Sequence, residues 1–172
     1  NTCLLHNKGW QGINIDINPT SIDLFNIARP RDINLCTTID ENKSEFKYYF
    51  DHPFSPVNTL DKEFYKDFKD SYIKKFKKDV FVGDVVKTVK SKTIDEILKI
   101  SERYKKIDFL NIDIEGMDLK IIKQILPYKF KPKLISIETH NPDNVKSRDC
   151  DQINNFLINN NYMVFKRVGP TT

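Results

Sequence analysis

The chain has few cysteines and no long apolar run. Its three cysteines, Cys3, Cys36 and Cys150, are an odd number, widely spaced, with no CxxC pair and no Cys/His cluster. This pattern is typical of reduced thiols in an intracellular protein, so we expect a cytoplasmic location. No apolar stretch approaches the roughly 20 residues that a membrane-spanning helix needs, and no signal peptide is visible.

Concentrated positive charge is also lacking. The net charge of +4 comes from lysines scattered along the sequence, without an arginine-rich block. This distribution favours solvated helix faces over a nucleic-acid surface, so we expect no nucleic-acid partner. The 172 residues, 39% hydrophobic and 30% charged, suit one globular domain with a substantial core.

Strand-like and helix-like segments alternate along the chain, without an internal repeat or a low-complexity tract. Alternating apolar residues indicate strands and a period near 3.6 indicates helices. This order predicts an α/β fold with a mostly parallel sheet. The predicted strands are 13–17, 33–39, 46–50, 80–89 with a bend at Gly83, 107–114, 132–138 and 162–168. The predicted helices are 20–28, 59–78, a helix that starts with a capping box of Thr93 and Glu96, 117–126 and 149–160.

Two of these helices have distinct apolar positions. In helix 20–28 we expect Leu24 and Ile27 to face the core. Helix 59–78 repeats an aromatic residue every fourth position and resembles an insertion at about 58–78. A core-facing aromatic stripe is the main expectation, and a lid or a partner-binding face is the alternative. The stripe comprises Leu60, Phe64, Phe68, Tyr72 and Phe76.

The segment from Ile107 to Gln124 changes from strand to helix at Gly116. Asp113 and Glu115 lie between the two halves, at the end of a strand where open α/β sheets bind ligands. We therefore favour a functional role for both carboxylates. The alternative is that they only cap the following helix and interact with its dipole.

Other predicted strands also end in polar residues: Asp16, the Thr37–Thr38 pair, and Glu138 followed by His140. Because successive parallel strands point the same way, we expect these ends to meet at one rim with Asp113 and Glu115. Asp16 could accept both hydroxyls of a ribose, or it could only start the next helix.

His140 could serve as a general base or be a hydrogen-bonded loop histidine. Together with Asp113, Glu115 and Glu138 it could also hold a hard cation such as magnesium. No ligand-spacing signature supports that possibility, so no metal ligand is predicted.

Several segments resemble the FkbM family of S-adenosylmethionine-dependent methyltransferases. They are GWQGINIDINP, CTTIDENKSEFKYY, TIDEIL and IDFLNIDIEGMDLKIIKQI, and they follow one another from about Gly9 to the last predicted strand. The IDFLNIDIEG block is the specific part of this similarity. The resemblance implies a three-layer Rossmann-like class I methyltransferase fold in one domain, 1–172, with S-adenosyl-L-methionine as cofactor.

The resemblance also implies roles for individual residues. Asp16 would bind the cofactor ribose with Asn18 nearby, while Thr38 and Ile39 would meet the adenine edge. Asp113 and Glu115 would lie beside the transferred methyl group, and Asp113 would also contact the cofactor. Family members act mostly on oxygen nucleophiles of glycans, polyketides and related small molecules, so we expect a glycan or small-molecule acceptor.

The expected reaction is O-methylation, in which the acceptor oxygen loses its proton to a base as it attacks the methyl group in line. Candidate bases are His140, Glu115 and Asp113. The family's glycine-rich loop should precede GWQGINID, and 1–8 contain no such loop. We therefore expect an N-terminally incomplete domain. A non-catalytic remnant of the fold and a magnesium-dependent glycosyl- or phosphoryl-transfer enzyme are the alternatives.

Overall fold

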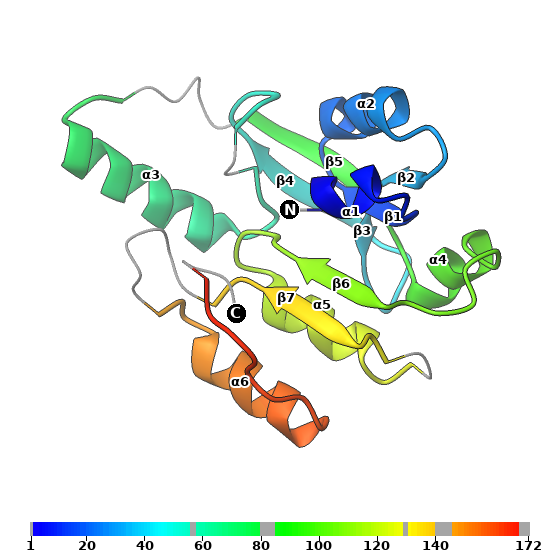
Figure 1. Ribbon diagram of the computed structural model, residues 1–172. Helices are drawn as coiled ribbons and strands as arrows, with labels where there is room; N and C mark the ends of the chain where they lie inside the picture. The colour runs from blue at the N-terminus through cyan, green and yellow to red at the C-terminus, as the bar shows by residue number, and fades with distance from the viewer. Residues whose placement is uncertain (1, 56–57, 80–84, 129–130, 140–145, 169–172) are drawn as a thin grey trace. The chain divides into compact units, whose positions relative to one another are not determined.

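The computed structural model describes residues 2–55, 58–79, 85–128, 131–139 and 146–168 (Figure 1). The chain groups into two compact units, Asn1–Glu102 and Arg103–Thr172, and each is described by itself. Unit 1 contains, in chain order, α1 (Cys3–Asn7), β1 (Ile13–Asp16), α2 (Pro19–Ala28), β2 (Ile33–Cys36), β3 (Thr38–Ile39), β4 (Glu45–Phe50), α3 (Lys62–Phe76), β5 (Val85–Lys92) and α4 (Ile94–Ile100). Unit 2 contains β6 (Phe109–Ile112), α5 (Asp118–Ile125), β7 (Leu134–Ile137) and α6 (Cys150–Asn159).

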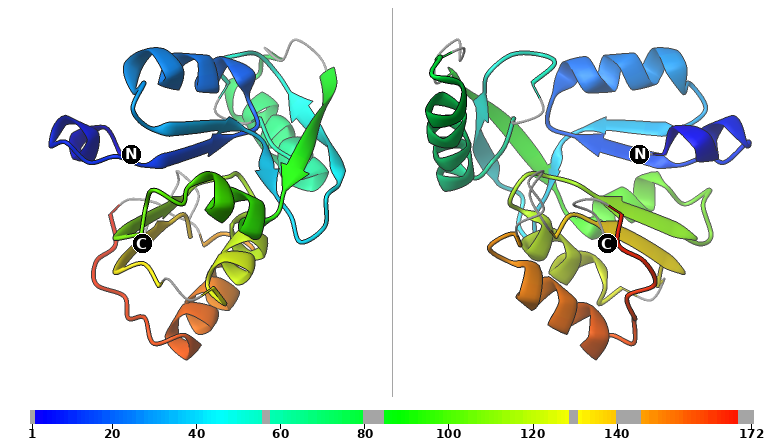
Figure 2. Two further views of the ribbon diagram at one scale, coloured as in Figure 1. Left: turned by 90° about the vertical axis from the view of Figure 1, so that its right-hand side faces the viewer. Right: turned by 60° about the vertical axis from the view of Figure 1, so that its left-hand side comes forward.

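Unit 1 has two small sheets. β1 and β2 are parallel, with Asp16 opposite Cys36, and both views of Figure 2 show α2 lying along this pair. In the second sheet β5 is parallel to β3 and antiparallel to β4. The predicted strand 33–39 is therefore divided between two sheets. Thr37 lies at the division, where its backbone N–H donates to the Asp16 carbonyl and its hydroxyl to the Lys90 carbonyl.

The prediction that Leu24 and Ile27 face the core is wrong. Their side chains are 52% and 80% exposed, and Ile22 is the buried residue of α2. The cause is a polar face on the strands beneath the helix. Asn14 donates to Asn34 at 2.8 Å, and Asn34 donates to Asn26 of α2 at 3.0 Å. A helix that meets amides has no apolar surface there on which to bury its leucine and isoleucine.

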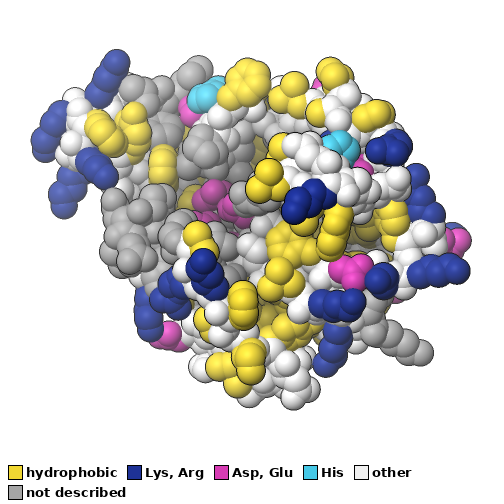
Figure 3. All heavy atoms as spheres, in the orientation of Figure 1, with side chains coloured by type: hydrophobic (Ala, Val, Ile, Leu, Met, Phe, Trp, Pro, Cys, Tyr) yellow, Lys and Arg dark blue, Asp and Glu magenta, His cyan; other side chains and the backbone are white. Residues whose placement is uncertain are grey.

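The aromatic stripe of α3 is only half-buried. Phe64, Phe68 and Tyr72 are of intermediate burial and Phe76 is 56% exposed, so the expectation of a core-facing stripe is wrong in extent. The fully buried residue is Tyr65, whose ring stacks on Tyr49 of β4 at 5.5 Å. In Figure 3 the region of α3 shows yellow side chains among dark-blue lysines. The rings of the stripe pack mainly along their own helix, with centroids 6.5, 6.2 and 4.6 Å apart in succession.

Phe68→Ala is therefore expected to cost about 1–2 kcal/mol of unfolding free energy, less than the full cost of a large-to-small core change. The half-buried ring loses only part of its contacts with protein when it is removed. Urea denaturation of both proteins measures the difference. A loss above about 3 kcal/mol would show that the ring is packed as a core residue.

Two further predictions concern β5 and α4. The predicted strand 80–89 corresponds to β5, which begins at Val85, and the proposed bend at Gly83 lies outside the described residues. The predicted capping box is confirmed: the Thr93 hydroxyl accepts from the Glu96 N–H, and the Glu96 carboxylate accepts from the Thr93 N–H. This box fixes the start of α4.

Unit 2 places two helices against a two-stranded parallel sheet (Figure 1). Its apolar residues come from both strands and both helices because each element buries one face. β6, β7 and α5 match the predicted segments 107–114, 132–138 and 117–126, with shorter bounds. The buried core consists of Ile112, Ile122, Leu126, Ile137 and Ile153.

The predicted last strand, 162–168, is wrong. Residues 162–167 form no strand, although Tyr162 is held by a 2.7 Å hydrogen bond from its hydroxyl to the Pro132 carbonyl. Met163 and Phe165 are more than four-fifths exposed. Strand propensity alone does not make a strand, because the backbone needs a neighbouring ladder to pair with.

The mixed α/β class is confirmed. Three strand pairings among the described residues are parallel and one is antiparallel, in three small sheets. The three-layer Rossmann-like arrangement around one mostly parallel sheet, and the single domain 1–172, stay predictions. Within the described ranges, none of the helices has the length and apolar character needed to cross a membrane.

Candidate functional site

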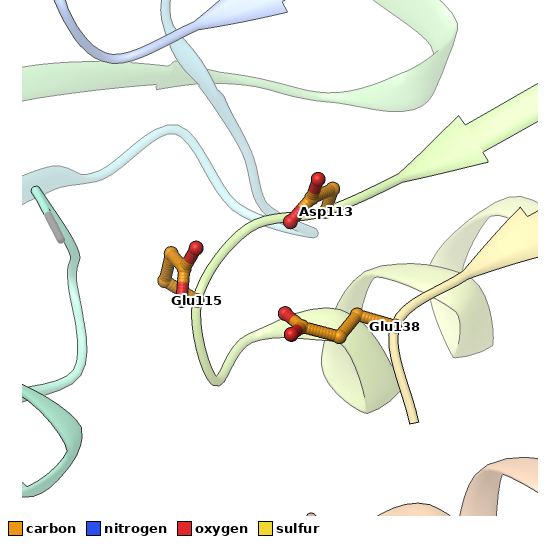
Figure 4. A group of neighbouring side chains, drawn as sticks. All are labelled: Asp113, Glu115 and Glu138. Atoms are coloured by element: carbon orange, nitrogen blue, oxygen red, sulfur yellow. The ribbon is translucent and has the colours of Figure 1, made fainter. Parts of the chain in front are cut away.

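Three carboxylates meet at the carboxyl end of the sheet in unit 2. Asp113 and Glu115 come from the turn between β6 and α5, and Glu138 directly follows β7 (Figure 4). One carboxylate oxygen from each lies within 4.8 Å of the others. We refer to Asp113, Glu115 and Glu138 as the carboxylate group.

The strand register explains why Asp113 and Glu138 are neighbours. Ile112 and Ile137 are paired across the parallel strands β6 and β7, and each is the last residue of its strand. The next residue on each strand is an acid, so both acids leave the sheet side by side. Both isoleucines are buried, which fixes the register through their packing.

Glu115 has an unusual backbone. Its φ is 51°, in the left-handed region that non-glycine residues rarely occupy, and Gly116 follows with φ 94°. A glutamate in this conformation costs on the order of 1 kcal/mol or more, and such strain concentrates at functional sites. The reversal turns the chain after β6 and brings the Glu115 carboxylate back beside Asp113.

The alternative that these acids cap α5 is wrong, and an interaction of the acids with the helix dipole stays a prediction. The N-cap position of α5 is Met117, and no side chain makes a cap hydrogen bond there. The buried acid of the first helical turn, Asp118, accepts a hydrogen bond from the Ile114 N–H at 3.4 Å. Asp118 therefore stabilises the turn, and neither Asp113 nor Glu115 is the N-cap of α5.

Burial and neighbouring negative charges make Glu115, Glu138 and the nearby Asp118 hard to ionise. Burial, followed by the negative charges of neighbouring carboxylates with Glu138 first, raises the pKa of Glu115 to about 8. Burial, followed by Asp113, raises the pKa of Glu138 to about 7. Burial likewise raises the pKa of Asp118 to about 6, although backbone hydrogen bonds oppose the shift.

Such a group has two chemical uses. A carboxylate with a pKa near neutrality can accept a proton from a substrate and later release it. Three oxygens at this spacing also suit a hard divalent cation, which prefers oxygen donors. Both uses place the reacting oxygen of a substrate next to Asp113, Glu115 and Glu138.

In unit 1, Asp16 ends β1 next to the start of α2. Its Oδ1 accepts a hydrogen bond from the Asn18 N–H at 2.8 Å, and Asn18 in turn caps α2 by accepting from the Thr20 N–H. The Asp16 Oδ2 atom has no hydrogen bond to any described residue. Partial burial and then the charge of Asp16 raise the pKa of the Cys36 thiol across the strand pair. Asp16 is thus a charged acceptor held at a strand end.

The family model for the methyltransferase FkbM domain matches residues 1–164. The chain belongs to the FkbM methyltransferase family. No curated protein and no solved structure matches it. The match covers nearly the whole chain, including β1 with Asp16 and the turn that carries Asp113 and Glu115. The resemblance carried by the IDFLNIDIEG block is confirmed.

Within this FkbM methyltransferase domain, the predicted cofactor residues differ in accessibility. Asn18 is 5% exposed, and its side chain both caps α2 and donates to the Pro53 carbonyl. Thr38 and Ile39 are buried in β3, paired with β5. Asp16 retains an open carboxylate oxygen, so it is the best placed of the four. Cofactor roles for these four residues and for Asp113, the fifth one predicted, stay predictions.

The remaining predicted residues have different outcomes. His140 lies outside the described residues. Asp113 and Glu115 are brought together, as expected from their place in one turn, and their meeting with Asp16 at one rim stays a prediction. Glu138 was predicted to meet Asp113 and Glu115 at the end of the sheet, without a catalytic role, and that meeting is confirmed. Asp118 was missed, although a third acid in the DIEGMD segment was a visible signal.

Proposed function

We propose that this FkbM methyltransferase domain transfers a methyl group from S-adenosyl-L-methionine to a hydroxyl of a glycan or small-molecule acceptor. Family membership supports a methyltransferase. The observation that carries the finer proposal is the carboxylate group, because a hydroxyl acceptor must lose a proton to become a good nucleophile. Carboxyl groups with pKa values near neutrality suit that step.

Asp16 is the residue we propose for holding the ribose of the cofactor. A ribose diol donates two hydrogen bonds, and a carboxylate at a strand end can accept both. The open Oδ2 atom of Asp16 fits this use, while its Oδ1 is already oriented by Asn18. The bound cofactor supplies an electrophilic methyl group on a sulfonium.

We propose that Glu115 orients the acceptor hydroxyl and that Glu138 accepts its proton. At neutral pH, the higher pKa keeps the Glu115 carboxyl mostly protonated, so it can donate a hydrogen bond that orients the acceptor oxygen. Glu138, with a pKa of about 7, is partly ionised and can accept the hydroxyl proton. Asp113 adds a negative charge that favours proton transfer toward the protein. His140 remains a further candidate base from the sequence.

Asp16→Ala tests the cofactor assignment. Loss of charge-assisted hydrogen bonds to two hydroxyls is expected to weaken S-adenosylhomocysteine binding by about 1.5–3 kcal/mol, with the fold retained. Isothermal titration calorimetry measures the change, and circular dichroism checks the fold. Asp23→Ala, which removes an exposed acid of α2, is the matched control. Equal affinity in the Asp16 variant and the parent would remove the ribose role.

The oxygen-donor spacing of the carboxylate group favours one second candidate, a magnesium-dependent glycosyl- or phosphoryl-transfer enzyme. Calorimetry with a nucleotide sugar in the presence of Mg²⁺ tests it directly. Magnesium-dependent binding of that sugar nucleotide, together with no binding of S-adenosylhomocysteine, would replace the methyltransferase proposal. Absence of both would indicate a non-catalytic remnant of the fold.

A further inference from the structure

The segment that follows β4 is held in place by its own hydrogen bonds. The Asp51 N–H donates to the Asn58 side chain at 2.9 Å, and that side chain donates to the His52 carbonyl at 3.0 Å. The Phe54 N–H donates to Nδ1 of His52 at 3.2 Å. Residues 51–55 therefore have a defined conformation next to the end of β4.

Asn18 joins this segment to Asp16. The buried Asn18 amide donates to the Pro53 carbonyl at 2.6 Å, while the Asn18 N–H donates to the Asp16 carboxylate at 2.8 Å. Two hydrogen bonds thus connect the Asp16 carboxylate to the carbonyl that precedes Phe54. The backbone that leads into Phe54 is therefore held near Asp16 by a buried residue of the same unit.

Phe54 itself is 74% exposed, and its ring makes no aromatic contact with the described residues. A single exposed phenylalanine is ordinary on a protein surface and by itself indicates nothing. Here the exposed ring follows a carbonyl that Asn18 connects to Asp16, and the Asp16 Oδ2 atom has no hydrogen bond to a described residue. The hydrogen bonds of the segment explain the position of its backbone, but they do not explain why a large apolar ring is exposed at position 54.

We propose that Phe54 is the aromatic platform on which the purine base of a nucleoside stacks while Asp16 holds its ribose. Base and ribose are directly bonded, so a nucleoside needs a planar apolar surface and a hydroxyl acceptor close to each other. Stacking on an aromatic side chain is a strong, geometry-tolerant way to bind a base. This inference rests on the proposed function, which places a nucleoside cofactor at Asp16, and it adds a specificity residue to that site.

Calorimetry on the full chain with S-adenosylhomocysteine and with adenosine tests the proposal. Phe54→Ala is expected to weaken both ligands about tenfold, because both carry the base. Phe54→Tyr should keep affinity within about twofold, since its ring still stacks. The matched control is Phe76→Ala, which removes another exposed ring and should bind both ligands as the parent does. Phe76 is the last residue of α3, roughly 20 Å from the start of that helix.

A second variant separates the ring from its position. Asn18→Ser keeps a good helix cap but is too short to reach the Pro53 carbonyl. If Asn18 positions Phe54, this change should lower adenosine affinity by several-fold, and adding Phe54→Ala should lower it little further. Full additivity of the two losses would overturn the positioning role of Asn18.

Fluorescence detects stacking on residue 54 directly, and a purely structural role of this residue would not change the signal. Trp10 is the single tryptophan, so Trp10→Phe combined with Phe54→Trp places one reporter in the segment. A purine stacked on that indole should quench its emission, and adenosine should do so in a saturable way. An emission unchanged by saturating adenosine would overturn the proposal.

Failure of the inference differs from failure of the proposed function. If Asp16→Ala weakens both ligands and Phe54→Ala weakens neither, the cofactor site stands and the platform is overturned. A loss for S-adenosylhomocysteine without a loss for adenosine would also overturn it, since the ring would then contact another part of the ligand. If the parent chain binds neither ligand, both the proposed function and the platform are overturned.

Discussion

Glu115→Gln and Asp113→Asn are each expected to lower the rate of methyl transfer by about 10²-fold or more, without loss of stability. Both substitutions keep the size and most of the hydrogen-bonding capacity of the side chain but remove the ionisable group. Neither acid caps α5, whose N-cap is Met117, so the helix does not depend on them. Glu138→Gln should have an effect on turnover as large as either.

The measurement is single-turnover transfer of a labelled methyl group to an accepted substrate, with thermal melting of the same samples. Asp151→Asn, on α6, removes an exposed acid that pairs with Lys146 in the same unit and serves as the control. The Glu115→Gln/Glu138→Gln double variant should be about as slow as the slower single variant, because residues that act as a unit are not additive. Turnover near that of the parent in the single variants would leave the carboxylate group without a catalytic role.

The second large effect is on the pH dependence of stability. The pKa of Glu115 is raised from 4.5 to about 8 in the folded protein, so this group favours folding when protonated. Its contribution is fully present below pH 4.5 and is lost as the pH rises toward 8, since the unfolded chain releases the proton first. A pKa change from 4.5 to about 8 corresponds to about 5 kcal/mol, and solvent screening of the partly exposed side chain reduces this value. Relative to the parent, Glu115→Gln should therefore gain about 3 kcal/mol of unfolding free energy between pH 4 and pH 8.5.

Urea denaturation at these two pH values, with a chelator present, measures this gain. Glu138→Gln should show a smaller gain, because its pKa is raised only to about 7 and its side chain is less buried. Asp151→Asn again provides the comparison for an exposed acid. Parallel stability curves for Glu115→Gln and the parent would show that Glu115 is ionised normally in the folded protein.

Much of the fold could be predicted because its signals are local. The change from alternation to helical spacing at Gly116 correctly separated β6 from α5. The capping box at Thr93 and Glu96 involves residues three positions apart, and it was found where predicted. In each case the determining contacts lie within one or two turns of chain, so the sequence pattern contains them.

Predictions that depended on distant partners were less successful. Leu24 and Ile27 have helical spacing, yet they are exposed because the strands beneath α2 present Asn14 and Asn34. Residues 162–167 have strand propensity, yet they form no strand. The sequence pattern of one element does not specify which face its neighbour offers, and burial is decided at that contact.

The candidate site likewise has some features that local sequence determines and others that depend on distant contacts. The sequence by itself determined that Asp113 and Glu115 share one strand-to-helix turn, and that Asp16 ends an early strand, because chain order and local periodicity are sufficient for both. The sequence also placed Glu138 at a strand end expected to meet them, but only the tertiary structure showed the pairing of Ile112 with Ile137 that makes Asp113 and Glu138 neighbours. It also decided the left-handed backbone of Glu115 and the raised pKa values. These depend on packing and on charges brought together from separate strands, which no local pattern specifies.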